Sequence, residues 1–194
     1  NSAYNVLFHP NDLYVFASRL DHSLQMWEID TRSAVRTFVG HTDVIASLRM
    51  SNDQRTLLTA AWDGSIRQWD IGTGLMTSKW RGHQGAVHIA IYHPDGKSVF
   101  SGGADRTIRI WDVATGKVTR QLEGHRAEVT SLIISPDQKM LISHSVDGIT
   151  KFWDLSTGME FFEHIHLGNR EWMAKSPEGY FHGTDQARQY IHFV

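Results

Sequence analysis

The chain has 194 residues, of which 41% are hydrophobic, so it is long enough to bury a sizeable core. Its formal net charge is −2 and its Lys and Arg residues are scattered singly, which argues against binding to nucleic acid or to an anionic membrane surface. It contains no cysteine, which excludes disulfides, thiolate metal ligands and a cysteine nucleophile within these residues.

Targeting and cofactor motifs are not visible in the sequence. No apolar stretch approaches the length of a membrane span, and the first residues, 1–4, lack the charged and apolar regions of a signal peptide. Together with the lack of cysteine, this is compatible with a reducing cytosol, and we expect a cytoplasmic protein. There is no Gly-rich phosphate loop, paired-carboxylate motif or nucleophile elbow, so we expect no cofactor and no catalytic residue.

One unit is copied along the chain at an interval of 42 residues. The recurring positions are Trp27, Trp69, Trp111 and Trp153; Asp21, Asp63, Asp105 and Asp147; and Gly-His pairs at 40–41, 82–83 and 124–125. The first copy departs from the pattern, since no Gly-His precedes it and its Trp is followed by Glu28. A fixed period near 40 residues indicates an array of repeated supersecondary units.

Within the third copy, four short strands are separated by turns. We expect strands at 86–91, 98–102, 107–113 and 118–122, because these segments alternate or are rich in β-branched residues. Segments 93–96, 104–106 and 114–117 carry the Pro, Gly and Asp residues that favour tight turns. No segment has a convincing helical period. Four antiparallel strands per repeat predict an all-β protein made of small twisted sheets.

These repeats resemble WD40 repeats, through the Gly-His pairs and through Trp-Asp at 69–70, 111–112 and 153–154. The resemblance implies a β-propeller in which each repeat is a blade. We expect one propeller segment over residues 1–194, with four regular four-stranded blades and a degenerate partial fifth, forming part of a larger propeller. The expected blades span about 4–39, 40–81, 82–123 and 124–166, followed by the partial blade at 167–194.

The family also implies a buried hydrogen-bonded tetrad in each regular blade. The expected sets are His41, Asp63, Thr59 and Trp69; His83, Asp105, Ser101 and Trp111; and His125, Asp147, Ser143 and Trp153. A neutral imidazole can donate to a carboxylate and accept from a hydroxyl, which in turn can accept the indole N–H. A hydrolase triad uses the same residue types, but a catalytic site is needed once and a structural clamp in every blade. In the first copy Ala17 replaces the hydroxyl, so we expect that blade to be looser or at an edge.

After Glu163 the repeat degrades, although Ser176-Pro177-Glu178-Gly179 matches the turn of the preceding copy. We expect the strands of the partial blade at 172–174, 180–182 and 189–194. The stretch from Glu171-Trp172 to Tyr180-Phe181, with the later segment 190–192, is similar to the closing segment of bacterial WD40 proteins. Some of those carry a caspase-like domain beyond the propeller.

Propellers bind partners mostly through one rim of loops, and family analogy places Leu20, Trp62, Ala104 and Val146 in the rim turns. Trp62 is the expected anchor, because a large aromatic side chain is a common interface hot spot. Asp43, Arg106 and Arg126 are further candidate contacts. Two more histidines, at 164 and 166, would share one face of a strand, and Glu163 and His182 could approach them, but we expect no metal site.

Two functions from different classes follow. The first is a non-catalytic scaffold or recognition module that mediates protein–protein contacts through the rim, with a protein or peptide partner of unknown identity. The alternative is the regulatory or sensor propeller of a larger bacterial enzyme, such as a caspase-like protease, whose catalytic residues lie outside this chain. An unclosed array leaves apolar faces bare, so we expect either the remainder of the same chain or a second copy to complete the ring.

Overall fold

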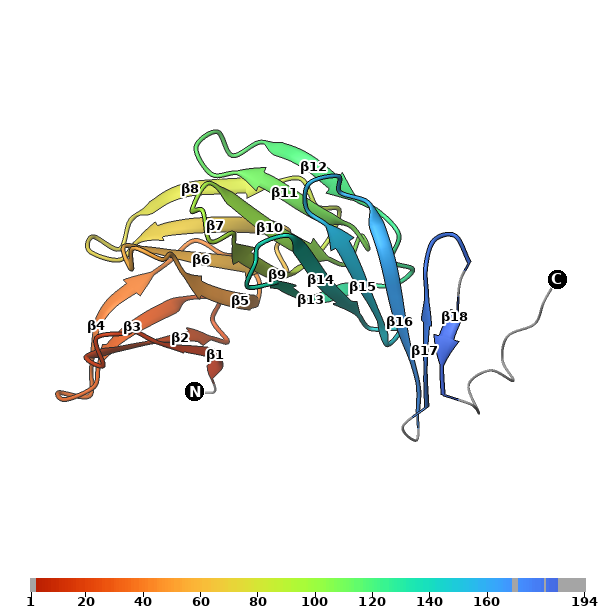
Figure 1. Ribbon diagram of the computed structural model, residues 1–194. Helices are drawn as coiled ribbons and strands as arrows, with labels where there is room; N and C mark the ends of the chain where they lie inside the picture. The colour runs from red at the N-terminus through yellow and green to blue at the C-terminus, as the bar shows by residue number, and fades with distance from the viewer. Residues whose placement is uncertain (1–2, 169–170, 180, 185–194) are drawn as a thin grey trace.

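The computed structural model describes residues 3–168, 171–179 and 181–184, and these residues form only strands, turns and loops. The chain builds four antiparallel sheets in succession, which follow one another along an open arc (Figure 1). The first sheet lies at one end of the arc, and the last strands, β17 and β18, lie at the other. The sequence prediction of an all-β propeller with four-stranded blades is therefore confirmed.

Each of the first three sheets has four strands in chain order. Sheet 1 consists of β1 (Ala3–Phe8), β2 (Tyr14–Arg19), β3 (Leu24–Glu28) and β4 (Ser33–Phe38). Sheet 2 consists of β5 (Ile45–Met50), β6 (Thr56–Ala61), β7 (Ser65–Asp70) and β8 (Met76–Arg81). Sheet 3 consists of β9 (Val87–Tyr92), β10 (Ser98–Gly103), β11 (Ile108–Asp112) and β12 (Val118–Leu122).

Sheet 4 has six strands. They are β13 (Val129–Ile134), β14 (Met140–Ser145), β15 (Ile149–Asp154), β16 (Glu160–Gly168), β17 (Glu171–Lys175) and β18 (Phe181–Gly183). The expected strands at 172–174 and 180–182 are thus present in part, but they do not start a new sheet, because β17 pairs with the outer strand β16 and β18 pairs with β17. The third expected strand, 189–194, lies outside the described residues.

The core consists of three layers between successive sheets. In each sheet we call the side toward the next sheet the forward face and the opposite side the rear face. The forward face of sheet 1 packs Phe16, Leu24 and Phe38 against Leu57 and Trp69 on the rear face of sheet 2. The other two interfaces repeat this arrangement with equivalent residues. Alternation along each strand thus supplies one apolar set to each face, because successive side chains point to opposite sides.

Two further contacts tie neighbouring sheets together. Trp80 of sheet 2 stacks on Trp111 of sheet 3, with ring centroids 6.1 Å apart and an interplanar angle of 14°. At the outer strands, Arg36 donates to the carbonyl of Ile71 (2.5 Å), and the equivalent residue two sheets later, Arg120, donates to the carbonyl of Leu155 (3.2 Å). These arginines fasten one sheet to the next through main-chain acceptors that any residue could supply.

The extension of sheet 4 is specified on both of its faces. On the rear face, Lys151, Glu163 and Lys175 are direct cross-strand partners on β15, β16 and β17. On the forward face, Trp172 is sandwiched between His164 and His182, with both centroid distances at 5.5 Å. Opposite charges and stacked rings in direct or diagonal register stabilise strand pairing. These pairs account for the continuation of the sheet beyond β16.

Sheet 1 differs from the regular sheets at its rear face. Trp27 is only half-buried, whereas Trp69, Trp111 and Trp153 are almost fully buried. Phe8 on β1 is 63% exposed. The rear face of this sheet is therefore not covered by the described residues.

Candidate functional site

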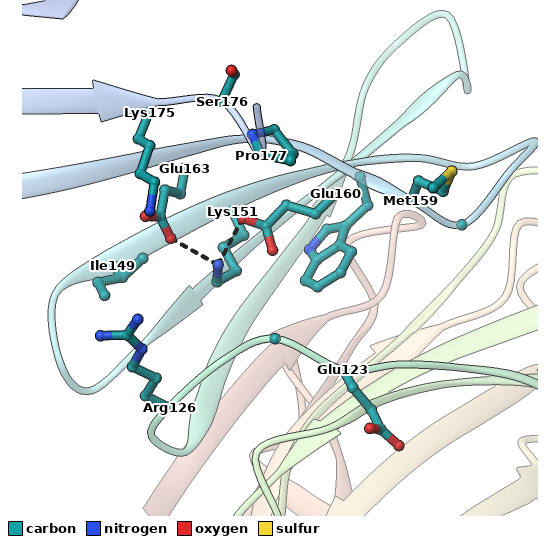
Figure 2. A pocket seen from close by; sticks show the side chains of 13 residues that line it. Glu123, Arg126, Ile149, Lys151, Met159, Glu160, Glu163, Lys175, Ser176 and Pro177 are labelled. Carbon is teal, nitrogen blue, oxygen red and sulfur yellow. Dashed lines mark hydrogen bonds and ion pairs between the residues drawn. The ribbon is translucent and has the colours of Figure 1, made fainter. Parts of the chain in front are cut away.

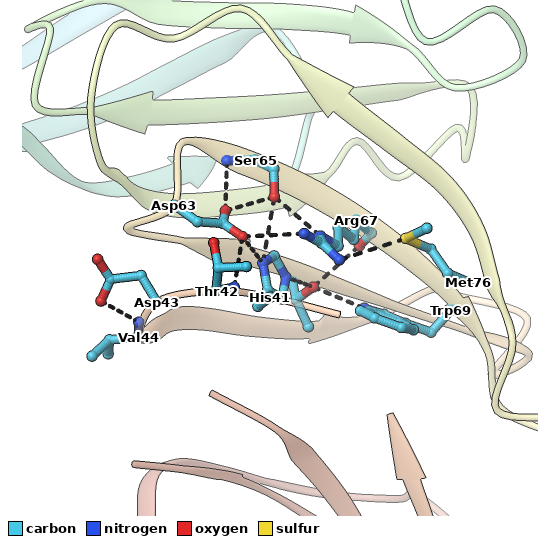
Figure 3. Close-up of polar contacts among 10 residues, drawn as sticks. His41, Thr42, Asp43, Val44, Asp63, Ser65, Arg67, Trp69 and Met76 are labelled. Carbon is cyan, nitrogen blue, oxygen red and sulfur yellow. Dashed lines mark hydrogen bonds and ion pairs between the residues drawn. The ribbon is translucent and has the colours of Figure 1, made fainter. Parts of the chain in front are cut away.

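The four side chains expected to form the tetrad of sheet 2 are in contact, and Figure 3 shows His41, Asp63 and Trp69 among them. The two ring nitrogens of His41 lie 2.9 Å from Asp63 Oδ2 (Nδ1) and 2.7 Å from Thr59 Oγ1 (Nε2). Trp69 Nε1 donates to the same Thr59 hydroxyl at 2.9 Å. Arg67 Nη2 adds a fifth member, 3.2 Å from the Asp63 carboxylate. The network links the loop before sheet 2 to β6 and β7.

Burial determines the protonation state of this network. Removal from water lowers the pKa of His41 below its usual range, so the ring is neutral near pH 7. Burial alone would raise the pKa of Asp63, but the hydrogen bonds from His41 and Ser65 outweigh it and hold that pKa well below its usual range. The partners then define one tautomer: His41 donates from Nδ1 to the carboxylate and accepts at Nε2 from the hydroxyl.

The network of sheet 3 has the same geometry. His83 lies 2.9 Å from Asp105 through Nδ1 and 2.7 Å from Ser101 Oγ through Nε2, and Trp111 Nε1 donates to that hydroxyl at 2.7 Å. Burial lowers the pKa of His83. The pKa of Asp105 falls to about 2, since the hydrogen bonds from His83 and the main chain of Gln84 outweigh the opposing effect of burial.

The fourth set is incomplete, in contrast with the expectation of a full tetrad. His125 Nε2 lies 2.6 Å from Ser143 Oγ, and Trp153 Nε1 donates to that hydroxyl at 2.8 Å. His125 Nδ1 is buried without a hydrogen-bond partner in the described structure. Asp147 is instead exposed and accepts from the Ser145 hydroxyl and from the Ile149 main chain.

The cause lies four residues after the aspartate. In sheets 2 and 3 an arginine at this position, Arg67 or Arg109, pairs with the aspartate. Sheet 4 has Lys151 there, whose Nζ pairs with Glu160 at 2.7 Å and with Glu163 at 2.8 Å (Figure 2). With its cation directed toward β16, nothing equivalent to the arginine holds the Asp147 carboxylate beside the imidazole.

The same lysine lines a cavity of about 420 Å³ between β15, β16 and the segment 175–177. Arg126 and Lys175 also border it, and Glu163 lies between Lys151 and Lys175 (Figure 2). Burial would lower the pKa of Lys151, but its two glutamate partners outweigh this and raise it. Because two carboxylates neutralise its buried ammonium group, Lys151 fastens β16 to β15 and is itself not free to pair with a ligand.

Buried networks of this kind are poorly placed for chemistry on a substrate. The side chains of His41 and Asp63 are 0% and 2% exposed, and Thr59 is fully buried. A nucleophile must be reached by the group that it attacks. The hydrogen bonds instead pair buried donors and acceptors of different strands, because buried polar groups need such partners.

The residues expected at the rim lie at equivalent turns of successive sheets. Leu20, Trp62 and Val146 are 57%, 40% and 63% exposed, while Ala104 is half-buried. Three of these four turns thus present a large apolar side chain to solvent.

Trp62 belongs to a line of contacts that crosses all four sheets. Its ring meets Tyr4 of sheet 1 edge-on at 6.2 Å and His88 of sheet 3 edge-on at 6.5 Å. His88 Nε2 in turn lies 2.7 Å from Glu128 Oε2, directly before sheet 4. The period of 42 residues relates Tyr4 to His88, but neither residue is among the rim positions expected from the sequence.

The three charged residues expected at the rim lie at separate sites. Arg106 is exposed at the turn of sheet 3 in a left-handed conformation with φ of 66°. Arg126 is exposed beside the cavity of sheet 4. Asp43 is half-buried and accepts a hydrogen bond from the main chain of Val44 at 2.7 Å. None of the three has a side-chain contact with Trp62 among the interactions of the described residues.

The histidines considered for metal binding have other neighbours. His164 stacks on Trp172, and Glu163 pairs with Lys151. Within residues 3–168, 171–179 and 181–184, no group of three or more His, Asp or Glu side chains is arranged to hold a metal ion. The same residues contain no helix with the length and apolar character needed to cross a membrane.

Comparison with known proteins adds two findings. The model of the family described as "WD domain, G-beta repeat" matches residues 32–70, 74–112 and 116–154, which is more than half of the chain. Over 60 residues the chain is 35% identical to the rat (Rattus norvegicus) protein named transducin beta-like protein 3. That stretch covers 30% of this chain and 8% of the rat protein, so the chain spans only a small part of that relative.

Proposed function

Because the chain belongs to the WD40 repeat family, we propose that it is a non-catalytic scaffold or recognition module that binds a protein or peptide through the rim containing Trp62. WD40 repeats suggest a protein-interaction scaffold, and propellers of this family are generally non-catalytic. The recurrence of one His-hydroxyl-Trp arrangement in three sheets supports a structural role for these groups, since a reaction needs its catalytic residues once. A cytoplasmic location remains part of the proposal.

The observation that carries the proposal is the line from Tyr4 through Trp62 and His88 to Glu128. It places an aromatic pair beside an imidazole–carboxylate pair on a surface that spans four sheets. Trp62 is held edge-on from both sides, so little side-chain entropy is lost when a partner covers it. Rigid aromatic anchors of this kind commonly dominate binding energy.

The test is affinity purification from the source cell with the wild-type chain and with Trp62→Ala. We expect the variant to lose its protein partners while its circular dichroism and melting temperature stay close to those of wild type, because 40% of Trp62 is exposed. The matched control is Leu75→Ala, which truncates a 68% exposed side chain in the loop between β7 and β8. Recovery of the same partners in the same amounts by wild type and Trp62→Ala would refute the proposal.

Two further proposals concern the surroundings of this module. The exposed rear face of sheet 1, with Val6 at 56% and Phe8 at 63% exposure, would be covered by further blades of the same polypeptide or by a second copy. Light scattering separates these, since a soluble monomer contradicts the second copy. The regulatory propeller of a larger bacterial enzyme, such as a caspase-like protease, remains the alternative, and the parent open reading frame would test it.

A further inference from the structure

Sheets 2 and 3, in the middle of the array, border a cavity of about 320 Å³. Sheet 1 packs on the other face of sheet 2, and sheet 4 packs on the other face of sheet 3 (Figure 1). The cavity lies beside the turns 51–55 and 93–97, which precede β6 and β10, whereas Trp62 follows β6. It is therefore at the opposite end of the strands from the rim, and between two sheets that are both covered.

Two polar side chains line the cavity from the facing sheets, Gln68 on β7 and Tyr92 on β9. Gln68 is 7% exposed, and its Nε2 donates to the Tyr92 hydroxyl at 3.0 Å. Burial raises the pKa of Tyr92 to about 12, so the hydroxyl stays neutral at physiological pH. The two sheets thus meet here through a buried hydrogen bond.

The other two interfaces have apolar side chains at the same positions of the repeat. The pairs 42 residues away are Met26 and Met50 between sheets 1 and 2, and Ile110 and Ile134 between sheets 3 and 4. Burying an apolar pair is more favourable than burying an amide and a phenol. The packing of the sheets therefore does not require Gln68 and Tyr92, and polar groups placed in a cavity in this way are typical of a ligand site.

Four oxygen atoms of residues that line the cavity accept no hydrogen bond from the described residues. They are Gln68 Oε1, Thr56 Oγ1, and the Oδ2 atoms of Asp53 and Asp95, whose Oδ1 atoms accept hydrogen bonds within their own turns. Gln68 Oε1 is unpaired but not sealed from solvent, although the residue is buried. This oxygen therefore faces the cavity that the residue lines.

The charge of the cavity favours a cation. The Ser51 hydroxyl, and then the Arg55 main chain, lower the pKa of Asp53. Burial alone would raise the pKa of Asp95, but hydrogen bonds from the Lys97 main chain and from His93 outweigh it and lower that pKa. Both carboxylates are thus ionised at neutral pH. Among the described residues that line the cavity there is no Lys, Arg or His, so an anionic ligand is disfavoured.

We propose that this cavity binds a guanidinium group, carried either by an arginine side chain of a polypeptide or by a small free molecule. Guanidinium has five N–H donors and no acceptor, so it suits a site whose unpaired groups are oxygens. Its planar faces are weakly hydrated and can contact the apolar part of the lining, Pro94 and Val113. The site is separate from the Trp62 rim, and the proposal does not depend on the proposed function.

The experiment titrates the purified protein with two guanidinium probes and follows its ¹H–¹⁵N NMR spectrum, including the side-chain amide of Gln68. The first probe is n-propylguanidinium. The second is a blocked tripeptide with glycine on either side of arginine. The control peptide has citrulline in place of arginine, because its urea group has nearly the same shape without the positive charge.

Two variants remove acceptors without introducing a residue that is foreign to the repeat. Gln68→Met copies Met26 of sheet 1, and Asp53→Asn copies Asn11, which accepts a hydrogen bond in the equivalent turn. The matched control is Asp137→Asn, since Asp137 makes the same two hydrogen bonds in its turn as Asp53 but does not line the cavity. Circular dichroism and thermal denaturation verify that each variant is folded.

We expect both probes to bind wild type with chemical shift changes centred on Gln68, Asp53 and Asp95. Gln68→Met and Asp53→Asn should each weaken binding about tenfold, a typical loss for a hydrogen bond to a charged group, and Asp137→Asn should not. If the tripeptide binds more tightly than propylguanidinium, a polypeptide is the source of the group; equal or tighter binding of propylguanidinium indicates the free cation.

Three results would overturn the proposal. They are the lack of saturable binding by either probe, equal binding of the citrulline peptide, and unchanged affinity in a folded Gln68→Met or Asp53→Asn protein. Should Gln68→Met fail to fold, Asp53→Asn and its control still decide the question, because both lie in exposed turns. Loss of partner capture by Trp62→Ala is measured separately, so the two proposals can fail independently.

Discussion

Arg120 extends from sheet 3 across Gly158 of sheet 4, and its Cδ lies 2.8 Å from the position that a β-carbon on this glycine would occupy. The glycine has φ of +76°, and the guanidinium group beyond it donates to the carbonyls of Leu155 and Ser156. Arg36 and Gly74 repeat the arrangement between sheets 1 and 2. The glycine of one sheet thus leaves room for an arginine side chain from the previous sheet, and this arginine holds the two sheets together.

This contact predicts that Gly158→Ala destabilises the protein more than Gly148→Ala. Both glycines have positive φ, at 76° and 81°, which costs an L-residue about 1 kcal/mol. A β-carbon at Gly148 meets nothing within 4 Å, whereas at Gly158 it displaces Arg120. The additional loss should be about 1 kcal/mol for the broken hydrogen bonds. Urea denaturation of both variants measures the difference, and equal losses would contradict the proposed arginine contact.

Ser101→Ala should lower the free energy of unfolding by about 2–3 kcal/mol. The hydroxyl serves His83 and Trp111 at once, and its removal leaves a buried ring nitrogen and a buried indole N–H without partners. Ser78→Ala is the control, because that half-buried hydroxyl makes no hydrogen bond to the described residues. Thermal and urea denaturation give the two values. If Ser101→Ala lowers the free energy of unfolding no more than Ser78→Ala does, the Ser101 hydroxyl does not stabilise the network.

Stability should fall between pH 6.5 and pH 4, and His125 should contribute to the decrease. Burial, and then the charge of Lys151, lower the pKa of this imidazole from 6.5 to about 4. The unfolded chain therefore takes up a proton before the folded chain does, so the free energy of unfolding decreases as the pH falls through this window. His125→Gln should show a shallower dependence in urea titrations at pH 7, 6 and 5. An identical slope for wild type and variant would contradict the assignment.

Lys151→Met should cost about 3 kcal/mol at neutral pH, a typical loss when one partner of a buried ion pair is removed. The lysine side chain is 6% exposed, and its removal leaves Glu160 and Glu163 close together without a cation. Lys117→Met is the matched control, since Lys117 is exposed and forms no ion pair within the described residues. Chemical denaturation checks the result. If both variants lose the same small amount, the network does not stabilise the β15–β16 pair.

The period of 42 residues made most of the fold predictable. Each copy carries its own turn residues and its own alternation, so strand pairing within a sheet is local and can be read from one repeat. The Trp, His and hydroxyl positions of sheets 2 to 4 were equally accessible, because a repeated spacing brings repeated contacts. The period also relates Tyr4 to His88, but it does not predict that both rings contact Trp62.

Features that break the repeat could not be predicted from it. The separation of Asp147 from His125 depends on Lys151, whose choice of Glu160 and Glu163 requires the register of β15 with β16. The attachment of β17 to β16 depends likewise on the register of Lys175 with Glu163 and on the stacking of Trp172 on His164, which a linear pattern does not reveal. The sequence predicted that the degenerate segment 167–194 starts a new sheet, because its turn resembles the turn of a repeat.

The arrangement of the sheets one after another along the chain has a consequence for local unfolding. Each sheet is packed against its neighbours in the chain, so an end sheet can detach while the middle stays folded, as in other linear arrays. Amide hydrogen exchange should accordingly form a gradient, slowest in β6 and β10 and fastest in β1 and β18. A partner that covers either end would slow exchange there first, and the position of that slowing would map where it binds.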